Sequence, residues 1–314
     1  MKSFDGLLQF APLYQPRVWG GRRLHTVLGR HLSDLGPIGE SWELVDRAEQ
    51  QSVVASGPHA GTTLHELWTR HRRDVFGAQA ATSTAPRFPL LIKILDCADD
   101  LSIQVHPPAT VAPTLGGEPK TEMWYVANAN PGSHIYAGLR AGVTRDAFER
   151  ALADGSVASV VHRLEAQEGD SLFVPSGRLH ALGAGLLIYE IQQSSDTTYR
   201  VFDWNRLGLD GRPRDLHVAQ SLASIDFDDV EPRLASGEGV LAASSFFRVS
   251  RVRTGHRAPI DGGFRLIMPI AQTSWAGEQL APGQLALCPA SYAAADPVGE
   301  WLEIELPLSG IQTE

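Results

Sequence analysis

The sequence predicts a mainly β protein, built as a sandwich or barrel with a few short helices. Three observations support this prediction. Short apolar runs follow one another along the chain, turn residues such as glycine, proline, aspartate and serine bound these runs, and segments with helical periodicity are few. Strands at this spacing, without helices alternating between them, are typical of sandwiches and barrels.

The expected strands are short segments rich in β-branched, aromatic and aliphatic residues. They are residues 89–95, 101–106, 122–129, 171–175, 186–193 and 199–204. The first expected helix begins at a capping box formed by Thr63 and Glu66, and an apolar stripe continues it to Val75. A second helix should start after Thr144 and end near Gly155. A third helix is expected over residues 216–225.

Composition limits the classes of function. The 314-residue chain is 43% hydrophobic and 20% charged, as expected of a folded globular protein. Its formal net charge of −9 argues against a nucleic-acid partner, because a phosphate backbone attracts basic surfaces. We expect no membrane partner, since the apolar runs are short and the N-terminus lacks a signal-peptide core. The protein is therefore expected to be cytoplasmic, with Cys97 and Cys288 as reduced, buried thiols.

One expected strand carries polar side chains in a row. In SIQVH, residues two apart share a face, so Ser102, Gln104 and His106 point away from the two apolar residues between them. PKTEMWYV alternates in the same way around Glu122, and GDSLFVPSGRLH ends a strand in a tight turn before His180. Two imidazoles, a carboxylate and an amide oxygen suit a borderline divalent ion, above all zinc, with a position left open for water or substrate.

The spacing of these segments resembles a known family. Gly169, Pro175, Gly177 and His180 form the pattern G-x5-P-x-G-x2-H, which is the second motif of the cupins. SIQVHPP and PKTEMWYV, together with GESWELVDR, LIKILDC and EIQQSSDTTYRVFDW, resemble the type I mannose-6-phosphate isomerases in their short bacterial form. The resemblance implies a cupin fold, that is, a double-stranded β-helix or jelly roll.

The last part of the chain echoes this architecture. After the acidic, glycine-containing residues 226–239 the strand pattern resumes, and Gly283 and Pro289 repeat the glycine–proline spacing of the motif without its histidine. We therefore expect a catalytic cupin domain with short helical segments over residues 1–230. A second, smaller and degenerate cupin-like β domain without metal ligands is expected over residues 235–314.

The resemblance implies a zinc-dependent isomerase that interconverts mannose 6-phosphate and fructose 6-phosphate through an enediol-type intermediate. One zinc ion per chain is expected at the residues that match the family's ligand positions, namely Gln104, His106, Glu122 and His180. Arg200 matches the family's active-site arginine. The residues that match polar positions of the substrate pocket are Ser102, Lys93 and Lys120.

The reaction requires a base and a phosphate site. A positioned base must move a proton between adjacent carbons of the opened sugar, and Lys120, Glu190 or a hydroxide held by the metal are the alternatives. The substrate phosphate needs cations or hydrogen-bond donors, for which Arg200, Lys93 and Ser102 are the candidates. These residues would supply the local basic pocket that an acidic protein needs to bind an anion.

The sequence is also compatible with other functions. The chain could be a metallo-cupin isomerase of another sugar phosphate, or an iron-dependent oxygenase, although Gln104 stands where the oxygenase pattern has a histidine. It could also be a sugar-binding cupin without catalysis. The metal ligands and the cationic residues are all present, which favours the isomerase.

Overall fold

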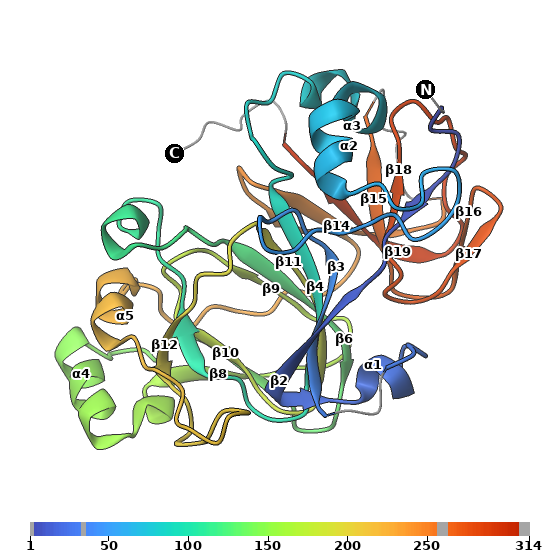
Figure 1. Ribbon diagram of the computed structural model, residues 1–314. Coiled ribbons are helices and arrows are strands. Elements are labelled where there is room, and N and C mark those ends of the chain that lie inside the picture. Colours follow the sequence, from blue (N-terminus) through green and yellow to red (C-terminus); the bar gives the residue numbers. More distant parts are fainter. Residues whose placement is uncertain (1–2, 33–35, 256–262, 308–314) are drawn as a thin grey trace. The chain divides into compact units, whose positions relative to one another are not determined.

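The computed structural model describes residues 3–32, 36–255 and 263–307, and strands dominate it (Figure 1). The predicted mainly β class is therefore confirmed. The described residues form two compact units. Unit 1 takes those within residues 1–13, 41–94 and 237–314, and unit 2 those within residues 14–40 and 95–236.

The unit boundaries bear on the expected domains. The change of unit at residue 237 lies near the boundary expected between residues 230 and 235. Residues 41–94, however, belong to the same unit as the C-terminal strands, although they precede the catalytic motifs in the sequence. The assignment of catalysis to residues 1–230 stays a prediction.

The strands of unit 2 belong to two sheets. One has the strand order β12-β5-β10-β7-β8. Its strands are β5 (Ile103–Val105), β7 (His134–Leu139), β8 (Val161–Glu165), β10 (His180–Leu182) and β12 (Tyr199–Phe202). The other has the order β2-β3-β4-β11-β6-β9. Its strands are β2 (Leu13–Gly21), β3 (Ile38–Leu44), β4 (Leu90–Cys97), β6 (Glu122–Ala129), β9 (Ser171–Val174) and β11 (Leu186–Gln193).

The alternation of side chains along β5 separates two environments. Ile103 and Val105 are buried on the outer face, in a cluster that also contains Phe148 and Ile225. Helices α4 (Arg145–Asp154) and α5 (Val218–Ser224) belong to this side of the sheet, as Figure 1 shows. The opposite face of β5 points to the second core cluster, which contains residues from both sheets. The polar row of the segment SIQVH therefore faces the interior of unit 2.

The helices begin and end where their capping residues predicted. Thr63 and Glu66 form the expected capping box at the start of α2 (Leu64–Arg70), and Thr144 caps α4, which ends at Gly155. The first expected helix is interrupted, since His71 leaves helical geometry with φ −126° and ψ 21° before α3 (Arg72–Ala80) begins. The remaining short helices are α1 (Arg23–Thr26), η1 (Ala112–Leu115) and η2 (Val157–Ser159).

Unit 1 contains a sheet with the strand order β1-β18-β15-β19-β14-β13 and the hairpin β16-β17. Its strands are β1 (Leu8–Gln9), β13 (Gly239–Ala243), β14 (Arg248–Arg253), β15 (Arg265–Pro269), β16 (Thr273–Trp275), β17 (Glu278–Leu280), β18 (Ala286–Cys288) and β19 (Glu300–Glu305). Gly283 precedes β18 with φ +74°, and Gly169 precedes β9 with φ +91°. The glycine of the repeated pattern thus has a left-handed backbone in both units, which explains why glycine stands there.

Each described helix falls short of what a membrane crossing requires in length and apolar character.

The close pairing of β10 with β7 makes a first prediction. Gly183 N–H donates to His134 O at 2.9 Å, and a Cβ at Gly183 would lie 2.5 Å from that same carbonyl oxygen. Gly183→Ala should therefore separate the strands and lower the free energy of unfolding by about 1–3 kcal/mol. Urea denaturation followed by circular dichroism measures the change. Gly6→Ala is the matched control, because the added Cβ meets nothing within 4 Å; an equal effect of the two substitutions would contradict the prediction.

Candidate metal centre

The candidate site lies on the inner faces of the two sheets of unit 2. His180 of β10 stands opposite Gln104 of β5, and Gln104 stands opposite Arg200 of β12. Directly opposite residues of antiparallel strands point to the same face, so the three side chains form one row. His106 lies two residues after Gln104 and continues this face beyond the end of β5. Glu122 comes from the other sheet, at the start of β6.

His106, Glu122 and His180 converge on one point. One imidazole nitrogen from each histidine and one carboxylate oxygen all lie within 4.8 Å of one another. His106 Nε2 is 3.4 Å from Glu122 Oε2, and His180 Nε2 is 3.6 Å from Glu122 Oε1. These three side chains are at most 1% exposed. The fold thus brings together three residues that are far apart in the sequence, and their role as metal ligands stays a prediction.

Hydrogen bonds to the backbone determine the tautomers of both histidines. His106 Nδ1 lies 2.8 Å from Thr197 O, and His180 Nδ1 lies 2.8 Å from Arg178 O. A carbonyl oxygen only accepts hydrogen bonds, so each Nδ1 carries the hydrogen and each Nε2 presents its lone pair. Metal-binding histidines are commonly oriented in this way by a carbonyl behind the ring.

Three of the donor atoms at the centre lack hydrogen-bond partners among the described residues. His106 Nε2 and both carboxylate oxygens of Glu122 are buried and accept no hydrogen bond among the described residues. An unsatisfied buried polar atom costs about 1–3 kcal/mol, and more when it is charged. A divalent cation bound by these nitrogen and oxygen atoms would satisfy all of them at once. The donor set therefore fits a zinc-type ion with an open coordination position.

The electrostatics favour the protonation state that binds a metal. Burial and the nearby Lys120 ammonium lower the pKa of His106 to about 3, and burial also lowers the pKa of His180. Burial by itself would raise the pKa of Glu122, but Lys120 and the two histidines hold it well below its usual value. At neutral pH the imidazoles are thus neutral and the carboxylate is ionised, so a metal ion need not displace protons.

Gln104 lies beside the centre, with its amide nitrogen toward it. Gln104 Nε2 is 3.3 Å from His180 Nε2, and Gln104 Oε1 accepts a hydrogen bond of 3.2 Å from Ser102 Oγ. Rotation of the amide by 180° exchanges its two ends, and only that orientation would present an oxygen to a metal. The expectation that Gln104 is a ligand therefore stays a prediction.

The two side chains expected as bases occupy the inner face of the second sheet. Lys120 Nζ lies 2.8 Å from Glu122 Oε2, a contact between opposite charges without hydrogen-bond geometry. Glu190 of β11 stands opposite Trp124, whose indole nitrogen donates to Glu190 Oε1 at 3.0 Å. The Trp124 ring meets His180 edge to face, with ring centroids 5.3 Å apart. Lys120 is thus the closer of the two to the converging donor atoms.

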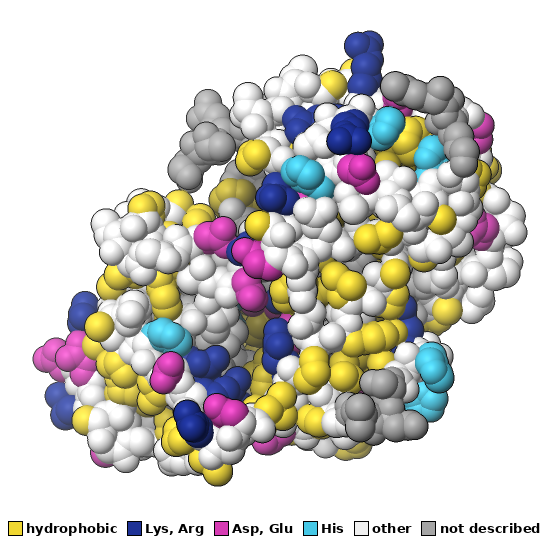
Figure 2. All heavy atoms as spheres, in the orientation of Figure 1, with side chains coloured by type: hydrophobic (Ala, Val, Ile, Leu, Met, Phe, Trp, Pro, Cys, Tyr) yellow, Lys and Arg dark blue, Asp and Glu magenta, His cyan; other side chains and the backbone are white. Residues whose placement is uncertain are grey.

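Arg200 belongs to a cluster of cations that sequence analysis missed. Asp203 accepts hydrogen bonds from Arg206 and from Arg214, and Arg200 Nη1 donates to Asp215 O at 2.8 Å. Burial and the charge of Arg214 lower the pKa of Arg200, which nevertheless stays charged at neutral pH. Figure 2 shows Lys and Arg side chains gathered near the place of β12 in Figure 1. The four arginines between residues 200 and 214 of an acidic chain were the available signal.

Lys93, expected at the substrate phosphate, lies on the part of β4 that belongs to unit 1. Its side chain is buried, and its ammonium group lies 5.4 Å from the centroid of the Trp42 ring. A cation over an indole face is stabilised by the ring quadrupole. The role of Lys93 in substrate binding stays a prediction.

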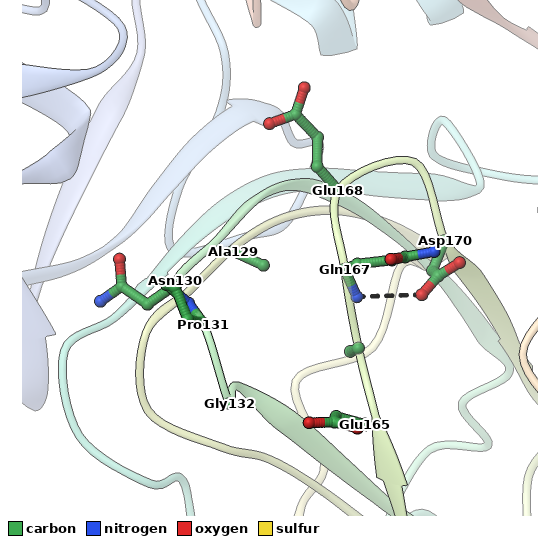
Figure 3. A pocket seen from close by; sticks show the side chains of 9 residues that line it. Ala129, Asn130, Pro131, Gly132, Glu165, Gln167, Glu168 and Asp170 are labelled. Atoms are coloured by element: carbon green, nitrogen blue, oxygen red, sulfur yellow. Dashed lines mark hydrogen bonds between the residues drawn. The ribbon is translucent and has the colours of Figure 1, made fainter.

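A separate pocket of about 530 Å³ is lined by residues 129–132, residues 165–168 and Asp170 of unit 2 (Figure 3). Glu165, Glu168 and Asp170 contribute carboxylates to it, and Asp170 accepts a hydrogen bond from the backbone N–H of Gln167. These negative charges would repel a phosphate. The pocket therefore does not suit an anionic sugar.

Comparisons with known proteins identify relatives of the chain. Residues 7–125 match the sequence profile of the phosphomannose isomerase type I catalytic domain. A mannose-6-phosphate isomerase of Streptococcus mutans is 39% identical over 241 residues, which cover 74% of this chain and 74% of that protein. The mannose-6-phosphate isomerase ManA of Bacillus subtilis is 37% identical over 232 residues, which cover 72% of this chain and 70% of that protein.

A solved structure has the same fold. The crystal structure of the mannose 6-phosphate isomerase from Bacillus subtilis superposes with a TM-score of 0.81 at 28% sequence identity. The match covers 96% of this chain and 100% of that chain. The cupin architecture expected from the motif is therefore confirmed.

The contact of Lys120 with Glu122 yields a prediction about stability. Lys120→Met leaves a buried carboxylate uncompensated, so the metal-free protein should lose about 3–5 kcal/mol in its free energy of unfolding. Zinc should restore most of this loss, because the metal supplies the missing positive charge. Urea denaturation with and without zinc measures both values. Arg150→Met, on the exposed side of α4, is the control. A loss that zinc leaves unchanged would argue against a metal at Glu122.

Proposed function

The chain belongs to the type I phosphomannose isomerase family and is a metal-dependent aldose–ketose isomerase, and we propose that it interconverts mannose 6-phosphate and fructose 6-phosphate around one zinc ion. In this proposal His106, Glu122 and His180 hold the zinc, and Gln104 is a fourth ligand after rotation of its amide. The observation that carries the proposal is the buried triad, in which His106 Nε2 and both carboxylate oxygens of Glu122 have no hydrogen-bond partner among the described residues. The cytoplasmic location stays a prediction.

The chemistry of the reaction needs each part of this site. Charge develops on the sugar oxygens as the proton moves between adjacent carbons, and a fixed positive charge that stabilises it often makes the largest contribution to catalysis. Zinc, when bound, supplies Lewis acidity at these oxygens. Arg200 shares the inner face with the ligands and adds a permanent cation.

The proton must be carried by a side chain of the site. We assign this role to Lys120 acting as a neutral amine, which accepts the proton from one carbon and returns it to the other, because its side-chain nitrogen lies 2.8 Å from Glu122 Oε2 in the proposed metal centre. Glu190 is the second candidate, and the hydrogen bond from Trp124 holds its carboxylate in place. A base within reach of both carbons can remove the proton from one and return it to the other.

The substrate phosphate requires cations away from the zinc. Arg200 is the proposed anchor in unit 2, with the buried Ser102 hydroxyl as a neutral donor. The phosphate role expected of Lys93 stays a prediction from the sequence. The arginines held by Asp203 place additional positive charge next to Arg200. This local excess of positive charge attracts a sugar phosphate to a protein whose formal net charge is −9.

Metal removal is the direct test of this function. Chelation should abolish isomerisation of mannose 6-phosphate, and added zinc should restore it, because the ligands remain in place without the ion. His106→Ala, Glu122→Ala and His180→Ala should each lose zinc and activity together. Metal analysis and a coupled isomerase assay on the same samples measure both. Full turnover by the zinc-free protein would refute the proposal, and iron with oxygen uptake would favour an oxygenase.

Arg200→Ala separates charge stabilisation from metal binding. The variant should retain zinc, since the guanidinium contacts none of the three ligands in the triad, while kcat/KM falls by about 100-fold or more. Turnover and zinc content are measured on one preparation. Arg150→Ala serves as a surface control. Unchanged turnover with bound zinc would make Arg200 a structural residue, and sugar-phosphate binding without any product would favour a non-catalytic cupin.

A further inference from the structure

We propose that Gln192 is a positioning residue for the metal centre, which controls zinc affinity by holding the segment 193–197 that orients His106. The proposal rests on the zinc site of the proposed function. Gln192 is not among the expected ligands.

Gln192 lies at the end of β11, directly opposite Glu122 of β6. It therefore shares the inner face with that carboxylate. Its side chain is fully buried. A glutamine in this position is costly to bury unless its amide has hydrogen-bond partners.

The two ends of the Gln192 amide are in very different environments. Its nitrogen donates to Gln193 O at 2.8 Å and to Ser195 O at 2.6 Å, and two carbonyl acceptors determine which end is the nitrogen. Its oxygen is buried and accepts no hydrogen bond from the described residues. The amide nitrogen thus provides hydrogen bonds to two carbonyl groups at the end of β11 and in the loop that follows, while the amide oxygen has no partner among the described residues. A buried group of this kind in a native fold requires an explanation, and a nearby functional site is one of them.

A chain of hydrogen bonds connects this amide to His106. Ser195, held through its carbonyl by Gln192, accepts a hydrogen bond of 3.2 Å at its Oγ from Thr197 N–H. Thr197 O then accepts the hydrogen bond of 2.8 Å from His106 Nδ1. The same Ser195 Oγ donates to Glu118 O at 3.3 Å, which ties the loop to the segment before β6.

The consequence concerns the lone pair of His106. Thr197 O keeps the hydrogen on Nδ1 and so directs Nε2 toward Glu122. If Gln192 no longer held Ser195, the carbonyl of Thr197 would be free to move, and His106 would lose its fixed tautomer and ring orientation. Loss of such an outer partner typically weakens metal binding by about 10–100-fold.

The experiment compares zinc affinity with stability in Gln192→Met. Methionine has a similar length and no polar end, so it removes the two donors together with the unsatisfied oxygen. We expect the Kd for zinc to rise by about 10-fold or more, measured by competition with a chelating indicator on metal-free protein. The melting temperature of the metal-free protein should fall only modestly, because Ser195 O loses its donor while the unpaired oxygen of Gln192 also disappears. A purely structural glutamine would lower the melting temperature and leave the Kd for zinc unchanged.

Two further variants complete the test. Ser195→Ala removes the hydroxyl that accepts the hydrogen bond from Thr197 N–H, so this substitution should also raise the Kd for zinc. In the double variant, the effects of Gln192→Met and Ser195→Ala on the Kd should not add. Ser195→Ala also provides the measurement if Gln192→Met fails to fold. Gln284→Met is the matched control, because Gln284 makes amide hydrogen bonds within unit 1, to Gln9 and from Ala281 N–H. Its Kd for zinc should equal that of the parent.

The outcomes separate this inference from the proposed function. A zinc Kd that changes by less than about threefold in both Gln192→Met and Ser195→Ala overturns the inference, even if the parent isomerises mannose 6-phosphate. Conversely, weaker zinc binding in both variants supports the inference, even if the parent binds zinc and isomerises nothing. A parent that binds no zinc overturns both.

Discussion

The burial of one carboxylate between two imidazoles is the constraint on which the rest of the site depends. Glu122 is fully buried, close to the nitrogen lone pairs of His106 and His180, and its oxygens accept no hydrogen bond from the described chain. Such an arrangement is unfavourable unless positive charge is supplied. Lys120 supplies part of it in the structure, at 2.8 Å. A metal ion would supply the rest.

The strands of unit 2 make this arrangement possible, because each strand places polar and apolar side chains on opposite faces. Along β5 the apolar residues pack outward beneath the helices, and the polar residues face inward. Trp124 and Ile188 belong to an apolar cluster, and Ser102, His106 and His180 are buried. Low exposure strengthens every charge interaction at the centre. The same packing therefore stabilises the fold and sets the electrostatics of the site.

The backbone behind the ligands contributes as much as the ligands themselves. Carbonyl groups of Thr197 and Arg178 determine the tautomers of the two histidines. Asp203, which lies close after Arg200 in the chain, gathers two more arginines into one cluster. In both cases irregular segments next to strands hold the groups that orient or charge the site. A rigid strand positions the functional side chain, and the adjoining loop adjusts it.

Local patterns in the sequence were sufficient for the mainly β class, for the strand at residues 186–193 and for the caps at Thr63 and Thr144, because these depend on neighbours along the chain. The three candidate ligands could also be recognised, since their motifs are short and specific. The break at His71 and the grouping of residues 41–94 with the C-terminal strands could not, because packing between distant segments decides them. The roles of Gln192 and of the arginines around Asp203 were equally invisible. Their significance arises from hydrogen bonds across folded loops, and alternation along a strand carries no information about such contacts.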